Sequence, residues 1–248
     1  MGPRTLSKPA EQELGLKQFG IVVATIAEAR SLTKRPVGAG GSISLRKGWV
    51  VQVSGVGPGR ARVAAERLLE AGAATLISWG SAAGLVPELS PGSLVLPKTI
   101  IGDNHVVYSA DATWQDSLLR RLRGHLEVHQ GPLAESLTVL RDYEEKAALS
   151  RRTGAVAADM ESAAVAAVAH KAGIPFLSIR AVADPVDMAV PLCAPIAVDE
   201  FGRLRPCRLL KELIKHPIQL LPLARLGRCF HAARATLSMV APLLERWP

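Results

Sequence analysis

The chain has 248 residues, of which 48% are hydrophobic, and this is enough for one large domain with a substantial core. Its formal net charge is +8, but only 4% of its residues are aromatic, so it lacks the base-stacking surface typical of nucleic-acid-binding proteins. The N-terminal stretch MGPRTLSKPAEQELGLKQFG is polar, and no window reaches about 18 to 20 uninterrupted apolar residues, so we expect neither a signal peptide nor a membrane span.

A flexible tail is predicted over residues 1–18, followed by a single domain over residues 19–248. The first predicted element is a buried strand, Ile21–Thr25, which runs into a helix beginning near Ala27. The stretch WVVQVSGVGPGRARVAAERLLEAGA repeats this arrangement with a strand, a Gly-rich turn, a helix and a glycine stop.

The Gly-rich turn GVGPG resembles a dinucleotide-binding fingerprint only in part. Arg60 occupies the place of the third glycine, and no acidic residue ends the following strand to hold a ribose hydroxyl. These departures argue against a dinucleotide site. Two interpretations stay open: a backbone nest beside a polar ligand, and a plain turn between a strand and a helix.

The next predicted strand, TLISW, is followed by the small residues GSAAG and then by the strand SLVLP. Small residues let a ligand approach the main chain, and Ser81 adds a hydroxyl, so GSAAG fits a binding loop. A tight turn fits the same residues equally well.

The third strand–helix unit contains an Ala-rich helix, Met160–Ala172, that has almost no polar face and is therefore expected to be sandwiched. It leads into the strand Phe176–Val182. Strands alternating with helices predict an α/β fold with a largely parallel central sheet. Glu28, the GVGPG turn, the GSAAG stretch and Asp184 all follow strands, where ligands of such sheets bind, so they form the candidate site.

The C-terminal segment, residues 201–248, accounts for most of the net positive charge. Leu209, Leu210, Leu213 and Ile214 fall at helical spacing, and two interpretations remain open: helices packed on the core, or a basic amphipathic element that lies on a membrane or covers an apolar groove. The segment contains two acidic and nine basic residues, the latter being Arg203, Arg205, Arg208, Lys211, Lys215, Arg225, Arg228, Arg234 and Arg246. The three cysteines, Cys193, Cys207 and Cys229, show no metal or disulfide pattern.

Several stretches together resemble the nucleoside phosphorylase and nucleosidase family, most closely its methylthioadenosine/S-adenosylhomocysteine nucleosidase branch. They are ATIAEARSL, SGVGPGRARVAA, SWGSAAGL, SPGSLVLP, ADMESAAVA and IPFLSIRAVADP. The resemblance implies a three-layer α/β/α sandwich with a mostly parallel, mixed central sheet. The long basic tail and the Asp-Pro after the last strand resemble the hopanoid-associated phosphorylase-like subgroup, which implies cleavage of adenosylhopane to adenine and ribosylhopane.

The resemblance also implies roles for the site residues. Asp184 matches the acid that protonates N7 of adenine, Glu161 the carboxylate that holds the ribose 2′ and 3′ hydroxyls, and Met160 a side chain that packs on the sugar. Glu28 matches the carboxylate that orients water, while Ser81 and the small residues around it, Gly80 included, would line the pocket near the nucleophile. The structural alternatives are a strand-ending Asp-Pro turn, two first-turn helix glutamates and a core methionine.

The sequence departs from the family pattern at two places. Ser78 stands where bacterial hexameric phosphorylases carry a phosphate-binding Arg, which favours hydrolysis, although Arg30 or Arg60 could replace the charge. The expected purine loop, residues 133–138, lacks the stacking Phe, so Leu133 or Leu137 would contact the base. His105 could approach the ribose, but a surface position fits it better.

The function predicted from these residues is N-glycosidic cleavage of an adenosyl compound. Purine nucleoside phosphorolysis, methylthioadenosine/S-adenosylhomocysteine cleavage and non-catalytic nucleoside binding are the alternatives. We expect no metal and no cofactor, a small-molecule substrate that is lipid-linked, no nucleic acid and a homodimer. The expected location is the cytoplasm, with contact to the inner membrane surface through the C-terminal segment.

Overall fold

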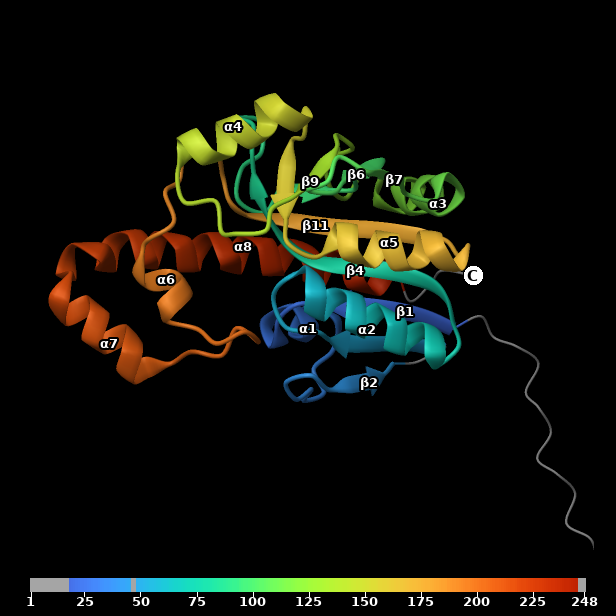
Figure 1. Ribbon diagram of the computed structural model, residues 1–248, viewed down its shortest axis with the longest axis horizontal. Helices are drawn as coiled ribbons and strands as arrows, with labels where there is room; N and C mark the ends of the chain where they lie inside the picture. Colours follow the sequence, from blue (N-terminus) through green and yellow to red (C-terminus); the bar gives the residue numbers. More distant parts are fainter. Residues whose placement is uncertain (1–17, 46–47, 245–248) are drawn as a thin grey trace, which may run out of the picture.

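The computed structural model describes residues 18–45 and 48–244, so the predicted tail lies outside the described residues except for Gln18 (Figure 1). The strands are β1 (Gln18–Val23), β2 (Ser42–Ser44), β3 (Trp49–Val53), β4 (Ala73–Gly84), β5 (Leu94–Val95), β6 (Thr99–Ile101), β7 (Val107–Ser109), β8 (Val128–His129), β9 (Leu133–Glu135), β10 (Ala157–Asp159) and β11 (Phe176–Asp184). The helices are α1 (Ile26–Leu32), α2 (Pro58–Glu70), α3 (Ala112–Leu122), α4 (Tyr143–Thr153), α5 (Ser162–Ala172), α6 (Cys193–Ile196), α7 (Pro206–Lys215), the 3₁₀ helix η2 (Pro217–Gln219) and α8 (Leu220–Leu244).

The central sheet is organised around the long strand β4. Strands β1 and β11 both pair with β4 in parallel, and β3 continues the parallel arrangement beyond β1. Strand β10 pairs with the last residues of β4 in the antiparallel direction. The sheet is therefore mixed and mostly parallel, as the sequence predicts.

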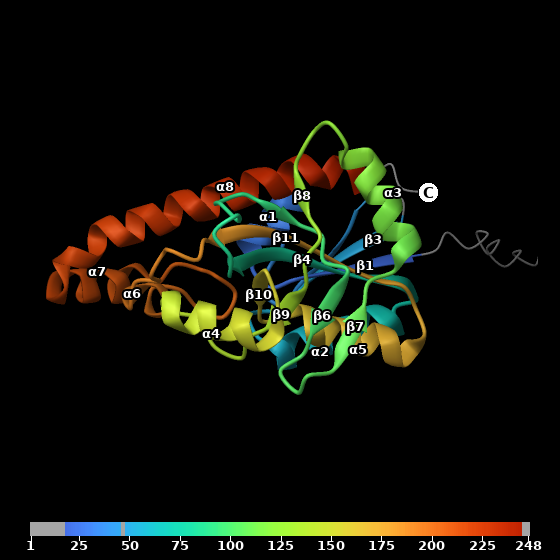
Figure 2. The ribbon, with the colours of Figure 1, turned by 90° about the horizontal axis from the view of Figure 1, so that it is seen from above.

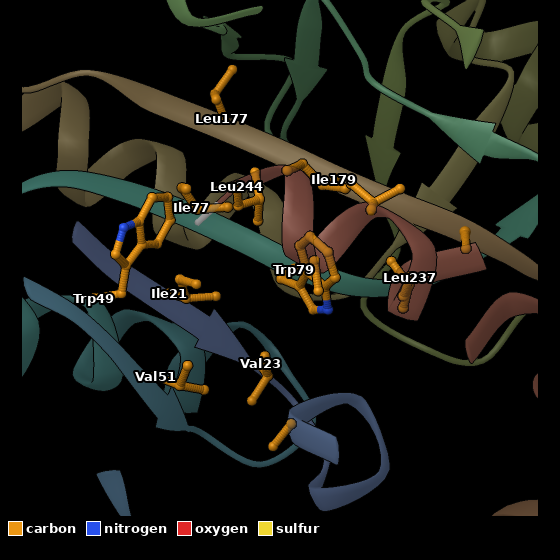
Figure 3. Packing of buried hydrophobic residues seen from close by; sticks show 14 of the residues in the cluster. Ile21, Val23, Trp49, Val51, Ile77, Trp79, Leu177, Ile179, Leu237 and Leu244 are labelled. Atoms are coloured by element: carbon orange, nitrogen blue, oxygen red, sulfur yellow. The ribbon is translucent and has the colours of Figure 1, made fainter. Parts of the chain in front are cut away.

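Helices cover both faces of this sheet and form three layers. Helices α2 and α5 lie on one face, and α1, α3 and α8 lie on the other (Figure 2). Alternation along β4 sends Leu76 to the first face and Ile77 and Trp79 to the second, where Trp79 and Ile179 pack near Leu237 of α8 (Figure 3). The predicted α/β/α sandwich is confirmed.

The Ala-rich helix α5 is sandwiched as expected, with small side chains buried against α2 and the sheet. Its predicted start at Met160 is wrong, because the helix begins at Ser162. Glu161 is the N-cap residue, and its backbone, with φ −129° and ψ −33°, lies outside the regular helical conformation.

The GSAAG stretch is neither a loop nor a turn, and both interpretations from the sequence are wrong. Strand β4 continues through it to Gly84. The stretch is held on two sides, because Gly80, Ser81 and Ala82 pair with β11 while the strand end pairs with β10. These pairings come from distant parts of the chain and override the weak strand propensity of small residues.

The C-terminal segment forms helices, but they differ in burial. Helix α7 buries none of its residues, whereas α8 packs on the sheet through residues such as Leu237 and Val240. Within residues 18–45 and 48–244, no helix is both long enough and apolar enough to cross a bilayer.

Candidate functional site

The carboxylate of Glu28 closes the N-terminus of α1. Its Oε2 accepts hydrogen bonds from the backbone N–H groups of Ala24 (3.1 Å) and Thr25 (2.9 Å), and the Thr25 hydroxyl accepts from the Glu28 N–H (3.2 Å). This reciprocal arrangement is a capping box. The local sequence TIAE therefore fixes the carboxylate at the end of β1.

The same carboxylate also reaches the neighbouring strand. Its Oε1 accepts from both the backbone N–H (2.8 Å) and the hydroxyl (2.9 Å) of Ser81. Four donors thus converge on a side chain that is only 9% exposed, so hydrogen bonds satisfy both of its oxygens. The predicted proximity of Glu28 and Ser81 is present in the structure.

Helix α1 is tied to β4 a second time, on the inner side of the capping box. The indole N–H of Trp79 donates to the hydroxyl of Ser31 (2.9 Å), which donates to the backbone carbonyl of Glu28 (2.6 Å). All three residues are buried. The position of Glu28 is therefore set by both ends of its short helix.

Gly80 has to be a glycine because two charged side chains lie against its main chain. A Cβ atom at this position would collide with Nη1 of Arg180 and would lie 2.5 Å from Oε1 of Glu28. The small residues of the GSAAG stretch serve close approach, as expected, but to side chains of the protein itself.

Glu161 lies at the N-terminus of α5 and faces the Gly-rich turn. Its Oε1 accepts from the backbone N–H of Gly57 at 2.9 Å, where the backbone has a φ of +105° that favours glycine. Burial, followed by the negative charge of Asp159, raises the pKa of Glu161 from its usual 4.5 to about 7, although Arg180 opposes the shift. The carboxyl group of Glu161 is therefore about half protonated near neutral pH.

A buried ion pair supports the site from the α5 face of the sheet. Nε of Arg180 lies 2.6 Å from Oδ2 of Asp159, and both side chains are 1% exposed. The guanidinium also donates to the hydroxyls of Ser78 and Ser162. Ser78, which replaces the phosphate-binding Arg of the phosphorylases that the sequence resembles, is therefore buried. Its hydroxyl accepts from Arg180, and Asp159 balances the charge of that guanidinium.

Asp184 ends β11 beside a second buried cation, Lys146 of α4. Nζ of Lys146 lies 3.1 Å from Oδ2 of Asp184 and donates to the carbonyls of Pro185 (2.8 Å) and Met188 (2.9 Å). Burial raises the pKa of Asp184 to about 6, although Lys146 opposes the shift. Lys146 thus holds both the carboxylate and the turn that follows it.

The strand register brings Asp184 to the same end of β4 as Glu28. Asp184 lies opposite Ala83 after a bulge in β11, and Ser81, which holds Glu28, is two residues earlier on β4, a rise of about 7 Å. Glu161 follows β10, and this strand runs antiparallel to the end of β4. Met160, half-buried, precedes it.

The expected base-binding residues are placed less favourably. Leu133 is fully buried in β9, so it is unavailable to a ligand, and this part of the prediction is wrong. Leu137 is 52% exposed and lines a cavity of about 300 Å³ with Glu135, Ser136 and Thr138, among others. None of the three predicted site carboxylates lines that cavity, but the Ser136 N–H donates to the carbonyl of Asp159 (2.7 Å), so the two regions adjoin.

The other candidates from the sequence lie at the surface. His105 is exposed and has a left-handed backbone with a φ of +61°. Arg30 and Arg60 are exposed, and Arg60 donates to the carbonyl of Val56 (3.2 Å). Sequence reasoning missed Lys146, Asp159 and Arg180; the only signals were one Arg inside an apolar strand and one Asp two positions before Glu161.

Comparison with known proteins decides the family. Residues 20–215, well over half of the chain, match the family model described as the phosphorylase superfamily. The chain belongs to the phosphorylase superfamily. The resemblance seen in its motifs is thereby confirmed at the level of the family, and a search of curated protein sequences gives no match.

Solved structures of other proteins share this phosphorylase-superfamily fold. The 5′-methylthioadenosine/S-adenosylhomocysteine nucleosidase of Helicobacter pylori superimposes with a TM-score of 0.68 at 17% identity, over 93% of this chain and 100% of that one. The nucleosidase of Neisseria meningitidis, solved with methylthio-immucillin-A, gives 0.67 at 22% identity, over 93% and 99%. The futalosine hydrolase of Helicobacter pylori gives 0.67 at 17%, over 92% and 98%.

Proposed function

We propose that the chain hydrolyses the N-glycosidic bond of an adenosyl compound. One observation carries this proposal: Glu28, Glu161 and Asp184 lie at the same end of the central strands, and each carboxylate has different partners. Breaking this bond places positive charge on the ribose and negative charge on the departing purine, so the reaction needs an acid, a hold on the sugar and a positioned nucleophile. The three carboxylates suit these three tasks.

Asp184 is the proposed acid at N7 of adenine. With the pKa of Asp184 raised from 3.8 to about 6, about one tenth of the molecules carry the proton at pH 7, far more than at the ordinary pKa, and this proton is available for donation to the leaving base. Lys146 fixes its orientation at 3.1 Å and keeps the pKa from rising further.

Glu161 is proposed to hold the ribose through its 2′ and 3′ hydroxyls, with Met160 against the sugar. The carboxylate is buried and accepts one hydrogen bond, from Gly57 at 2.9 Å. Two hydroxyl donors would replace the water that it has lost and would stabilise its charged form, which in turn favours the developing cation on the sugar.

Glu28 is proposed to orient the attacking water beside Ser81. The water oxygen would bond to the anomeric carbon, the base would leave with the proton of Asp184, and Glu28 would accept the proton of the water. Among the residues that the structure describes, the guanidinium that bonds to Ser78 is that of Arg180, which Asp159 balances at 2.6 Å, and Arg30 and Arg60 are exposed. The described residues thus place no unpaired cation at Ser78, which supports water over phosphate as the nucleophile.

For the substrate we propose adenosylhopane, cleaved to adenine and ribosylhopane, as the motif resemblance implies. The competing substrate is methylthioadenosine, since structural neighbours are methylthioadenosine/S-adenosylhomocysteine nucleosidases. We also propose a homodimer, because the family resemblance implies a pocket completed at a subunit contact.

Product analysis tests the reaction. The purified protein is incubated with adenosylhopane in mixed micelles, or with methylthioadenosine, with and without phosphate. We expect adenine and a sugar with a free anomeric hydroxyl, and a higher kcat/KM for adenosylhopane. Sugar 1-phosphate that accumulates in proportion to phosphate would make the chain a phosphorylase, and cleavage of methylthioadenosine alone would reject the hopanoid substrate.

A further inference from the structure

Helix α7, η2 and the first turns of α8 form a helical arm, which we define as residues 206–228. In both ribbon views the turn between α7 and α8 lies at the end of the molecule remote from β1 and α3 (Figures 1 and 2). Leu226 is the only buried residue of the arm. The arm is therefore an extension of the fold, and its outer part contributes little to the core.

The tip of the arm exposes large apolar side chains. Ile214, Ile218 and Leu221 are exposed by 73%, 85% and 80%, and Leu210 and Leu220 are exposed as well. Leu210 and Ile214 are four residues apart and lie on one face of α7, while Ile218 lies in η2 and Leu220 and Leu221 begin α8. Apolar side chains this exposed at the end of the molecule fit a fluid apolar medium better than a single fixed groove.

Basic side chains flank these apolar residues. The arm contains Arg208, Lys211, Lys215, Arg225 and Arg228 against one acidic residue, Glu212. Lys215 pairs with Glu212 at 3.2 Å and Arg225 with Asp187 at 3.3 Å, both at the surface. The other three basic residues form no ion pair with any residue that the structure describes.

The arm is joined to the edge of the sheet that carries the site. In the segment that leads into α7, the carbonyl of Phe201 accepts from the N–H of Ile26 in α1 (3.1 Å), and the carbonyl of Glu200 accepts from the N–H of Val56 in the Gly-rich turn (2.7 Å). At the base of the arm, Leu226 packs near Met188, whose carbonyl binds the buried lysine next to Asp184. The arm thus extends from the same edge of the sheet as the carboxylates.

We propose that the helical arm docks the protein on an anionic lipid bilayer, with the apolar tip inserted below the headgroups and the basic residues at the phosphates. Exposed apolar groups on the same element as Lys and Arg are the combination that binds such a surface. The inference deepens the proposed function, since a substrate with an apolar 5′ substituent resides in the bilayer and would reach the site without crossing water.

Vesicle co-sedimentation tests the docking. Wild type is mixed with vesicles of phosphatidylcholine containing phosphatidylglycerol, and with phosphatidylcholine alone, at low and high salt. We expect binding to the anionic vesicles that weakens as salt rises. The triple variants Ile214→Glu/Ile218→Glu/Leu221→Glu and Arg208→Glu/Lys211→Glu/Arg228→Glu should each lower the partition coefficient at least about tenfold.

Matched controls change similar residues outside the arm. Val107→Glu alters an exposed apolar residue of β7, and Arg120→Glu/Arg123→Glu alters a basic residue of α3 and the basic C-cap residue of that helix. Both variants should bind vesicles within about twofold of wild type. The arm variants should keep the wild-type rate on a soluble adenosyl nucleoside, and Asp184→Asn should keep wild-type vesicle binding. A loss of vesicle binding can therefore be distinguished from a loss of catalysis.

Three results would overturn the proposal. The first is that wild type does not bind anionic vesicles, and the second is that both arm variants bind them as well as wild type does. The third is that the control variants lose as much vesicle binding as the arm variants. Light scattering gives the oligomeric state of each variant. If the apolar triple variant converts a dimer to a monomer and wild type ignores vesicles, the arm is a contact between two copies of this chain.

Discussion

The site and the helical arm break the usual rule of burial in opposite directions. At the site the side chains of Lys146, Asp159 and Arg180 carry charge yet are nearly or fully inaccessible to solvent. In the arm, Ile218 and Leu221 are apolar yet exposed. Each arrangement costs stability relative to the ordinary one, so both mark places where the sequence serves something other than folding.

The two regions differ in how the cost is offset. The buried charges are balanced inside the chain, by ion pairs of 2.6 Å and 3.1 Å and by hydrogen bonds to carbonyls and hydroxyls. No described residue covers the apolar tip of the arm. Substitutions at the site should therefore affect the isolated protein strongly, whereas those in the arm should affect it only when a partner is present.

The largest effect is expected for Asp184→Asn. The amide keeps an oxygen that accepts from Lys146 but cannot donate a proton to the leaving base, so adenine release should fall by about 10²- to 10⁴-fold or more. Stopped assays of adenine release measure the loss, and circular dichroism checks that the fold is retained. A rate within about tenfold of wild type would remove Asp184 from the role of acid.

Gly80→Ala tests how tightly the buried charges are arranged. The new methyl group would collide with Arg180 and Glu28, so we expect a loss of about 1–3 kcal/mol in the free energy of unfolding together with reduced activity. Urea denaturation measures the first effect. The control is Gly59→Ala in α2, where a Cβ meets no atom within 4 Å, and a gain of about 0.4–1 kcal/mol is expected there. Equal effects at both positions would contradict the close packing.

Glu161→Gln tests the cost of burying a carboxylate. Because the pKa of Glu161 is raised from 4.5 to about 7, the folded state binds more protons than the unfolded state between these values, and wild type loses stability as pH rises through that window. The amide of the variant does not titrate, so the variant does not lose this stability as pH rises. Its stability relative to wild type should therefore increase from pH 4.5 to pH 8 by on the order of 2–3 kcal/mol. Denaturation at several pH values measures the difference, and a constant difference would refute the shift.

The smallest effect is expected in the arm. Ile218→Ser removes an apolar side chain that is 85% exposed, so the free energy of unfolding should change by less than about 0.5 kcal/mol. Leu237→Ser in the buried half of the C-terminal helices is the matched comparison, because that side chain is 1% exposed, and a loss of several kcal/mol is expected. Similar losses at both positions would show that the tip of the arm is covered.

The order of elements could be predicted from the sequence because apolar runs and helical spacing are local signals. The strand through GSAAG could not, since its pairing depends on β10 and β11, which follow about 75 to 100 residues later. For the same reason the sequence does not reveal the two buried ion pairs, Arg180 with Asp159 and Lys146 with Asp184. Helical spacing in the C-terminal segment predicted α7 but left its exposure open, because an amphipathic stripe can pack on a core or face outward.

The bond between Trp79 and Ser31 gives the molecule an internal optical reporter. The indole is fully buried and linked through one hydroxyl to the helix that carries Glu28. Its fluorescence depends on the polarity and rigidity of that environment, so a ligand that moves α1 would change the emission without any added label. Subtracting the spectrum of Trp79→Phe would isolate this signal from those of the other tryptophans and would allow ligand binding near α1 to be followed in real time.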